Sequence, residues 1–163
     1  EGTRVHSVAD PNSSVAGYLV FASDSLQVEF FYPETDVVLD RRTRPDGTPV
    51  WNVEDDDTYL VEKAESEWLV SRRGQFLYAT SGVEDLVKAA FVADGGEEIE
   101  ILFFGKAGVA QMNRNGVYSL LRQYRTASGY GYKNPVFDLR GKGQEAVLTT
   151  LSDGSRLALK EKK

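Results

Sequence analysis

Short apolar segments that alternate with turn signals are the feature that most constrains the fold of this chain. Segments rich in Val, Phe, Tyr and Leu recur along the sequence, with Gly, Asn, Asp or Pro between them. Asn115-Gly116 favours a two-residue hairpin turn, and Pro45-Asp46-Gly47 and Asp153-Gly154 are further turn signals. Strands spaced by about 8 to 12 residues are typical of antiparallel sandwiches and barrels. The sequence therefore predicts a mainly β fold.

The expected strands lie on both sides of one helical pattern. Before it they span 18–21, 26–32, 36–40, 50–53, 58–61, 68–71 and 75–80, and after it 91–93, 99–104, 108–112, 117–121, 136–139, 146–151 and 156–159. Residues 83–90 are expected to form a short helix, because Ser81 and Glu84 have the spacing of a capping box. The polar residues 62–67 are expected to form a turn of helix. These patterns predict a flexible lead-in at 1–16, a β-rich region at 17–82, a helical connector at 83–90 and a small antiparallel barrel at 91–163.

Composition excludes several classes of protein. No apolar run approaches the roughly 20 residues of a membrane helix, so no transmembrane segment is predicted. The sequence has no cysteine, which excludes disulfides, thiolate metal sites and cysteine nucleophiles. Its single histidine, His6, lies in the lead-in, where we expect neither a ligand nor a catalyst. The opening residues lack the apolar core of a signal peptide.

Charge is distributed unevenly along the chain. The first 90 residues carry a net charge of −9, with 17 acidic and 8 basic residues, whereas residues 91–163 carry +3. The acidic part argues against a nucleic-acid partner. The run Glu54 to Asp57 could be a calcium loop, but it lacks the alternating ligands and the glycine of an EF-hand, so we expect a solvated turn.

Two glycine-bounded loops are the strongest functional signal. The first is Thr126 to Tyr132, in which Ser128 precedes Gly129, and the second is Gly141 to Ala146, in which Lys142 lies between two glycines. The number of residues between Ser128 and Lys142 suits one short strand with its flanking turns. We therefore expect the two loop tips to lie side by side at one end of a sheet.

In these loops the chain resembles the family of membrane-bound inhibitors of c-type lysozyme (MliC-like proteins). The resemblance covers Phe91 to Leu159. The matching pieces are Ala127-Ser128-Gly129 followed by Tyr132, an aromatic strand at Phe137, Lys142-Gly143 followed by Glu145-Ala146, and the Asp153-Gly154 hairpin. The family's pattern there is A-S-G-x-x-Y followed by F-W-x-K-G-D-E-A.

This resemblance implies a small barrel of the bacterial envelope, in the periplasm or associated with the outer membrane, and often a lipoprotein. It implies a c-type lysozyme as partner, no cofactor and no enzymatic activity. The inserting residues of the family carry over to Ser128 and Lys142, and the expected lysozyme-binding set also contains Gly129, Tyr132, Gly143 and Glu145. An ammonium group between the two catalytic carboxyl groups of a lysozyme would gain a charge-assisted hydrogen bond.

Other interpretations stay open at this point. Gln144 stands where the family usually has aspartate, and Ala93 stands near the place of its first cysteine. Both favour a non-inhibitory envelope module with a glycan or protein partner. A glycosidase using paired carboxylates such as Asp138 and Glu145 is a third hypothesis.

The aromatic residues and the first region also leave alternatives. Trp51, Trp68 and the pair Tyr130 and Tyr132 are either core residues or a stacking platform for sugar. Residues 17–80 match no family that we can name. Because Leu26–Tyr32 resembles Ile99–Phe104, this region could be a second copy of the barrel, without the serine and lysine loops.

Overall fold

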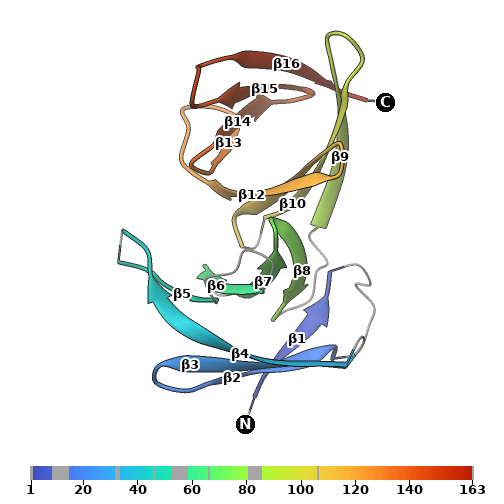
Figure 1. The fold of residues 1–163 in the computed structure, drawn as a ribbon. Coiled ribbons are helices and arrows are strands. Elements are labelled where there is room, and N and C mark those ends of the chain that lie inside the picture. Colours follow the sequence, from blue (N-terminus) through green and yellow to red (C-terminus); the bar gives the residue numbers. More distant parts are fainter. Residues whose placement is uncertain are drawn as a thin grey trace. The chain divides into compact units, whose positions relative to one another are not determined.

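In a computed structural model, which describes residues 2–8, 15–31, 34–45, 47–52, 59–65, 67–80, 86–105 and 107–162, the chain folds into two compact units. They span Glu1–Glu84 and Asp85–Lys163. Each unit is a closed barrel of antiparallel strands (Figure 1). The predicted β fold and the C-terminal barrel are therefore confirmed.

The first barrel has eight strands in sequence order, and β1 pairs with β8 to close it. Closure gives each described strand a paired neighbour on both sides. The strands are β1 (Thr3–Ser7), β2 (Gly17–Phe21), β3 (Ser25–Phe31), β4 (Glu34–Thr43), β5 (Pro49–Asn52), β6 (Leu60–Ala64), β7 (Glu67–Arg72) and β8 (Gln75–Ala79).

The second barrel repeats this arrangement, and β9 pairs with β16 to close it. Its strands are β9 (Leu86–Ala93), β10 (Glu98–Phe104), β11 (Val109–Arg114), β12 (Val117–Gln123), β13 (Tyr130–Lys133), β14 (Phe137–Lys142), β15 (Glu145–Thr150) and β16 (Arg156–Glu161).

The inward rows of the two barrels correspond strand by strand. Across β2, β3 and β4 one row of cross-strand partners runs Phe21, Leu26, Leu39, and across β10, β11 and β12 it runs Phe103, Ala110, Leu121. Across β5 to β8 a second row runs Trp51, Val61, Val70, Tyr78, and across β13 to β16 it runs Tyr132, Leu139, Leu148, Leu157. All of these side chains lie in, or pack against, the core of their own barrel.

This correspondence agrees with the suggestion that the first region has the same barrel architecture as the second. The strand match differs from the one expected from the sequence, however. By strand order β3 corresponds to β11, so Leu26–Tyr32 is not the counterpart of Ile99–Phe104. The inward side chains, rather than the overall likeness of two apolar runs, identify the matching strands.

Several predicted turns are confirmed. Asn115 and Gly116 have φ of +56° and +82° and connect β11 to β12, as a two-residue hairpin requires. The Ala22 N–H donates to the Ser25 carbonyl at 2.9 Å in the β2–β3 hairpin. The Gly154 N–H donates to the Thr150 carbonyl at 2.8 Å between β15 and β16.

The helix predicted at 83–90 is wrong for residues 86–90, which belong to β9. Leu86 to Val92 pair with Phe104 to Glu98 of β10, and Ala89, Phe91 and Ala93 face the core. This ladder, together with pairing to β16, supplies the strand that closes the barrel, and it outweighs a weak local helical preference. The second barrel thus begins before residue 91, and residues 83–85 lie outside the described residues.

Two smaller expectations are also wrong. Residues 3–7, expected in the flexible lead-in, form β1 and pair with both β2 and β8. Residues 62–65, expected in a turn of helix, belong to β6 and the hairpin turn that follows, where Glu65 has φ of +56°. In both places the chain is needed to complete the closed ladder of the barrel.

Candidate functional site

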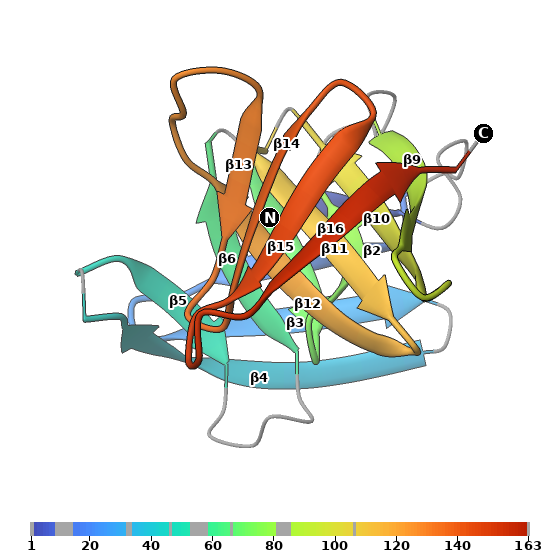
Figure 2. The ribbon, with the colours of Figure 1, turned by 90° about the horizontal axis from the view of Figure 1, so that it is seen from above.

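The serine loop and the lysine turn lie at the same end of the second barrel. The serine loop, residues 124–129, connects β12 to β13, and the lysine turn, residues 143–144, connects β14 to β15. Because β13 and β14 are antiparallel partners in which Tyr130 pairs with Gly141, the two connections emerge side by side (Figure 2). The structure therefore brings Ser128 and Lys142 to one rim, as expected from their spacing.

Gly129 packs directly against the end of β14 that carries Lys142. Its φ is +72°, a conformation that costs side-chain-bearing residues about 1–2 kcal/mol. A Cβ added there would lie 2.0 Å from the Gly141 carbonyl oxygen and 3.1 Å from Lys142 Cβ. Only a glycine fits this position without moving the backbone. Gly129 therefore allows Ser128 to lie directly beside the strand that carries Lys142.

Thr126 fixes the interior of the serine loop. Its hydroxyl lies 3.0 Å from the Ser128 carbonyl oxygen and 3.1 Å from the Gly129 carbonyl oxygen, so it donates a shared hydrogen bond to both. The Ser128 side chain is left exposed. A threonine near a turn commonly forms hydrogen bonds with the local backbone, so this role has a signal in the sequence.

Lys142 is presented by a tight hairpin. Lys142 pairs with Glu145, and Gly143 and Gln144 form the two-residue turn between them. The φ of Gly143 is +62°, which suits the first central position of a type II′ turn. Residues 142–145 are exposed. In the part of the chain that the structure describes, neither Lys142 nor Glu145 has an ion-pair partner.

Tyr132 is a core residue, contrary to its expected place among the contact residues. Only 5% of it is exposed, and its ring centroid lies 5.5 Å from that of Phe103. Tyr130 points the same way and packs against the same core, with its ring over Gly141. The core interpretation of this tyrosine pair is therefore confirmed.

The Tyr130 hydroxyl is buried and has no hydrogen-bond partner among the described residues. Burial, with smaller contributions from Glu161 and Tyr132, raises the pKa of Tyr130 to about 12. The phenol is therefore neutral at physiological pH. It forms an apolar support beneath the strand end that carries Lys142.

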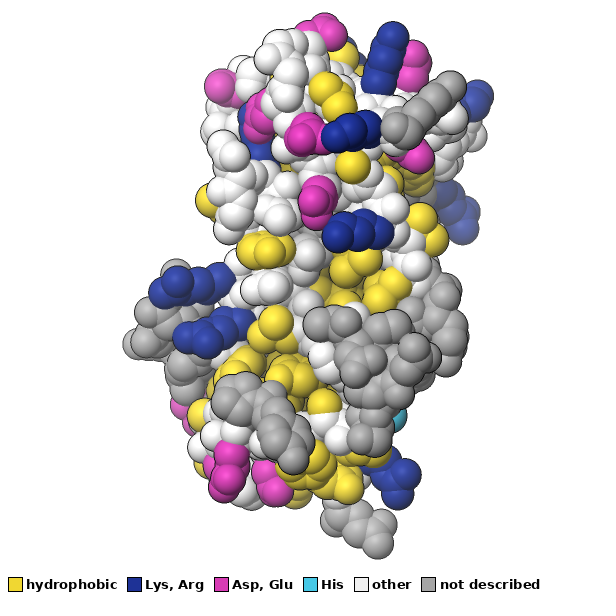
Figure 3. All heavy atoms as spheres, turned by 90° about the vertical axis from the view of Figure 1, so that its right-hand side faces the viewer, with side chains coloured by type: hydrophobic (Ala, Val, Ile, Leu, Met, Phe, Trp, Pro, Cys, Tyr) yellow, Lys and Arg dark blue, Asp and Glu magenta, His cyan; other side chains and the backbone are white. Residues whose placement is uncertain are grey.

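A hollow of about 730 Å³ opens beside the lysine turn, where β14, β15, β16 and the end of β9 meet. Small residues such as Gly141, Ala146 and Ala158 leave the space. The charged side chains that line it are Asp94, Arg140, Lys142, Glu145 and Lys160. The uncharged Ser128 also lines it. On the face of the second unit shown in Figure 3, Lys and Arg side chains likewise alternate with Asp and Glu. The rim is thus a mixed-charge surface with a free ammonium group at its edge.

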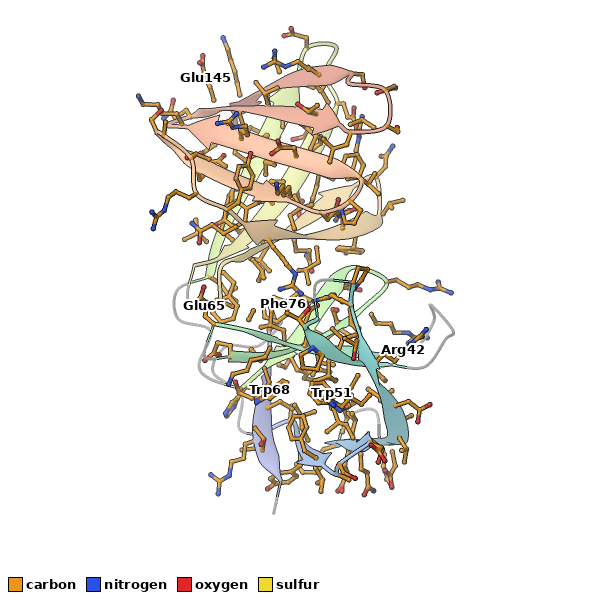
Figure 4. The ribbon with its side chains drawn as sticks, turned by 90° about the vertical axis from the view of Figure 1, so that its left-hand side faces the viewer. Arg42, Trp51, Glu65, Trp68, Phe76 and Glu145 are labelled. Carbon is orange, nitrogen blue, oxygen red and sulfur yellow. The ribbon has the colours of Figure 1, made fainter. Side chains whose placement is uncertain are left out.

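The other candidates from the sequence do not form a site. Asp138 accepts a hydrogen bond from the Tyr124 hydroxyl at 2.6 Å. It pairs with Thr149 in the β14–β15 ladder, whereas Glu145 ends that ladder opposite Lys142 (Figure 4). The two carboxylates of the glycosidase hypothesis are therefore separated along the hairpin.

The structure bears on the sugar-platform interpretation of the tryptophans, whereas the calcium-loop interpretation of residues 54–57 is not tested. Within the described ranges no group of His, Asp and Glu could hold a metal ion, and the acidic run 54–57 lies outside them. His6 is part of β1, where it pairs with Ala79. Trp51 and Trp68 lie side by side in the first unit with ring centroids 5.3 Å apart (Figure 4), and both belong to or pack against its core.

Comparison with protein families finds a match to the second barrel. The family model described as membrane-bound lysozyme-inhibitor of c-type lysozyme matches residues 91–156. This span runs from within β9 to the start of β16 and includes both the serine loop and the lysine turn. The description is of inhibitors rather than enzymes. No curated protein and no solved structure matches the chain.

Proposed function

We propose that the second barrel, a domain of the family of membrane-bound inhibitors of c-type lysozyme, inhibits such a lysozyme by inserting Ser128 and Lys142 into its catalytic cleft. The contact of Gly129 with Gly141 supports this most directly. It holds a hydroxyl and a free ammonium group together at one rim. Two separate loops could then enter one cleft as a single projection.

The chemistry of the cleft suits these two groups. A c-type lysozyme cleaves its substrate with two carboxyl groups, one of which donates a proton. Lys142 can donate charge-assisted hydrogen bonds to a carboxylate in a desolvated cleft. The Ser128 hydroxyl can accept from the protonated carboxyl group and donate to the ionised one. Since Lys142 has no ion-pair partner among the described residues, no such bond has to be broken first.

The remaining residues of the expected set have supporting roles in this proposal. Gly129 and Gly143 permit the backbone conformations of the two tips. Glu145 lies opposite Lys142 across the hairpin and adds an exposed carboxylate to the mixed-charge rim. Tyr132 supports β13 from inside the barrel and makes no contact with the partner.

The proposal assigns inhibition to the second barrel alone. In the first barrel the β6–β7 hairpin occupies the place of β14–β15, and Ala64 stands where the second barrel has Lys142. The family's name describes membrane-bound proteins, so we further propose an envelope location, in the periplasm or at the outer membrane, with a lipid anchor as the attachment. A search of the described residues finds no helix suited to crossing a membrane.

A second candidate is an envelope module that has the same barrel but binds a glycan or another protein. Gln144 favours it, because an exposed amide replaces the carboxylate usual at this position of the lysine turn. The absence of the cysteine that the family has near position 93 favours it less, since Ala93 is buried in the core of the barrel.

Inhibition of a c-type lysozyme on a suspension of bacterial cell walls tests the first proposal. Wild type is expected to slow clearing, and Lys142→Ala is expected to weaken inhibition by about 30-fold or more, as the loss of about 2–5 kcal/mol from a buried charge pair implies. Lys63→Ala, in the corresponding hairpin of the first barrel, is the matched control and should inhibit as wild type does. No inhibition by wild type at micromolar concentration would favour the second candidate, and equal inhibition by all three proteins would show that Lys142 is not an inserting residue.

A further inference from the structure

Tyr124, the first residue of the serine loop, is attached to both neighbouring strands. Its backbone N–H donates to the Gly131 carbonyl at 2.9 Å, which continues the β12–β13 ladder by one residue. Its ring lies against the Gly131 backbone, since a Cβ added to Gly131 would be 2.6 Å from the Tyr124 Cζ. The ring therefore covers β13 at a place where only a glycine leaves room for it.

The Tyr124 hydroxyl reaches one strand further. It donates to Asp138 Oδ1 on β14 at 2.6 Å, and the Lys133 ammonium lies 4.8 Å from the ring centroid. Burial and, after it, the hydrogen bond to Asp138 raise the pKa of Tyr124 to about 12. The phenol therefore stays a neutral donor across the physiological range. This one side chain connects the start of the serine loop to the strand that ends in Lys142.

The rest of the serine loop also packs against β13 and β14. A Cβ on Gly131 would also lie 2.7 Å from Thr126 Cγ2, so Tyr124 and Thr126 together cover this glycine. Thr126 in turn bonds the carbonyls of Ser128 and Gly129. Since Gly129 rests on Gly141, the loop is fixed at its beginning, middle and end. Ser128 is left as an exposed side chain on an ordered backbone.

We infer that Tyr124 is a positioning residue for lysozyme binding: its hydrogen bond to Asp138 orders the serine loop before the partner arrives and sets Ser128 beside Lys142. The inference rests on the proposed function for its effect on affinity. A loop that is already ordered pays less conformational entropy on binding, which strengthens binding without adding a contact. Tyr124 lies outside the pattern that carries the family resemblance.

Conservative substitutions at Tyr124 and Asp138 distinguish this role from a general loss of structure. Tyr124→Phe removes only the hydroxyl and keeps the ring over Gly131. Asp138→Asn keeps an oxygen that accepts from the hydroxyl, whereas Asp138→Leu removes the acceptor. Tyr118→Phe is the matched control, because Tyr118 lies on β12, the strand that leads to Tyr124, but next to the Asn115-Gly116 turn at the opposite end of the barrel.

Two measurements are made on each full-length variant. The inhibition constant against a c-type lysozyme is expected to rise about tenfold in Tyr124→Phe and Asp138→Leu, because one contact that orders the loop is lost. It should stay within about threefold of wild type in Asp138→Asn and Tyr118→Phe. Backbone ¹⁵N relaxation should show greater mobility at Ser128 and Gly129 in the two weakened variants, with the amides of Leu139 and Leu148 unchanged.

The outcomes distinguish this inference from the function on which it rests. If Lys142→Ala abolishes inhibition while Tyr124→Phe inhibits as wild type does, positioning by Tyr124 is wrong and the two-loop mechanism stands. If Lys142→Ala has no effect, the mechanism is wrong. The relaxation of Ser128 in Tyr124→Phe then still decides whether the hydroxyl orders the loop, and a loop as rigid as in wild type overturns that claim.

Discussion

The two barrels share a backbone plan and differ in what their turns present. In the β14–β15 hairpin Lys142 faces Glu145, and in the β6–β7 hairpin Ala64 faces Glu67. The first turn residue has a positive φ in both, +62° at Gly143 and +56° at Glu65. The first turn residue thus has a positive φ in both hairpins, while the position before it carries an ammonium group only in the second barrel. Barrel closure depends on the inward rows, and the proposed function depends on a few exposed turn residues.

The neighbouring loops differ in the same way. Gly129 in the β12–β13 loop has φ of +72° and rests on the backbone of Gly141. Gly47 in the corresponding β4–β5 loop has φ of +90°, and nothing lies within 4 Å of the Cβ it lacks. Gly129 permits a close approach between the serine loop and β14, whereas Gly47 only permits the backbone conformation of its turn. The same residue type in the same loop therefore has different consequences in the two barrels.

Truncation of a matched core leucine should have the largest effect and should separate the barrels. Leu39 and Leu121 occupy corresponding places and are 1% and 0% exposed. Leu39→Ala and Leu121→Ala should each cost about 2–5 kcal/mol of the stability of the barrel concerned, from lost burial and the cavity left behind. Only Leu121→Ala should reduce lysozyme inhibition.

The measurement uses the position of the tryptophans. Both Trp51 and Trp68 lie in the first barrel, so tryptophan fluorescence during urea unfolding follows that barrel alone. Its transition should move in Leu39→Ala and stay in place in Leu121→Ala, where circular dichroism should record the change instead. A shift of the fluorescence transition in Leu121→Ala would show that the two barrels unfold as one unit.

Substitution of the matched loop glycines should have the next largest effect. Gly129→Ala places a Cβ against the Gly141 carbonyl in addition to the cost of a positive φ, so the loop must move away from Lys142. We expect a loss of inhibition of at least about tenfold, together with a cost of about 1–2 kcal/mol or more. Gly47→Ala carries the conformational cost alone and should inhibit normally. Equal inhibition by both variants would mean that the contact with Gly141 is not needed.

Alkaline pH should destabilise the second barrel, because two of its tyrosines have raised pKa values. The pKa values of Tyr124 and Tyr130 rise from 10 to about 12 in the folded chain, chiefly through burial. Folding therefore favours the protonated phenols, and this stabilisation is complete below pH 10 and is lost as the pH rises from 10 to 12. Tyr124→Phe should show a shallower fall in stability over this range than Tyr118→Phe. Parallel curves, followed by circular dichroism in urea, would contradict this assignment.

Much of the fold could be predicted from residue patterns, because strand alternation and turn chemistry are local. Asn115-Gly116 indicated its hairpin directly, since both positions require a positive φ. The failures came where closure decides the structure. Residues 86–90 have the spacing of an apolar helical face, yet pairing with β10 and β16 makes them the closing strand. No local signal encodes a partner in the ladder that lies elsewhere in the sequence.

The nearness of the two candidate loops was predicted from Ser128 and Lys142, whose loops contain recognisable glycine patterns. Tyr132 was expected among the contact residues but lies in the core. The sequence alone does not reveal which face of a short strand points inward when its register is unknown. Tyr124 was missed because its partners, Gly131 and Asp138, come from two other strands. Contacts that cross strands are specified by the fold and appear only once the register is known.

The most direct test of the two-loop mechanism is a double-mutant cycle across the complex. Lys142→Met is combined with replacement of the catalytic glutamate of the c-type lysozyme by glutamine, and the four affinities are measured by calorimetry at constant salt. If the ammonium group sits between the catalytic carboxyl groups, the two changes should be coupled by about 1.5 kcal/mol or more. Additive effects, with no coupling between Lys142 and that carboxyl group, would contradict the insertion of Lys142 into the cleft.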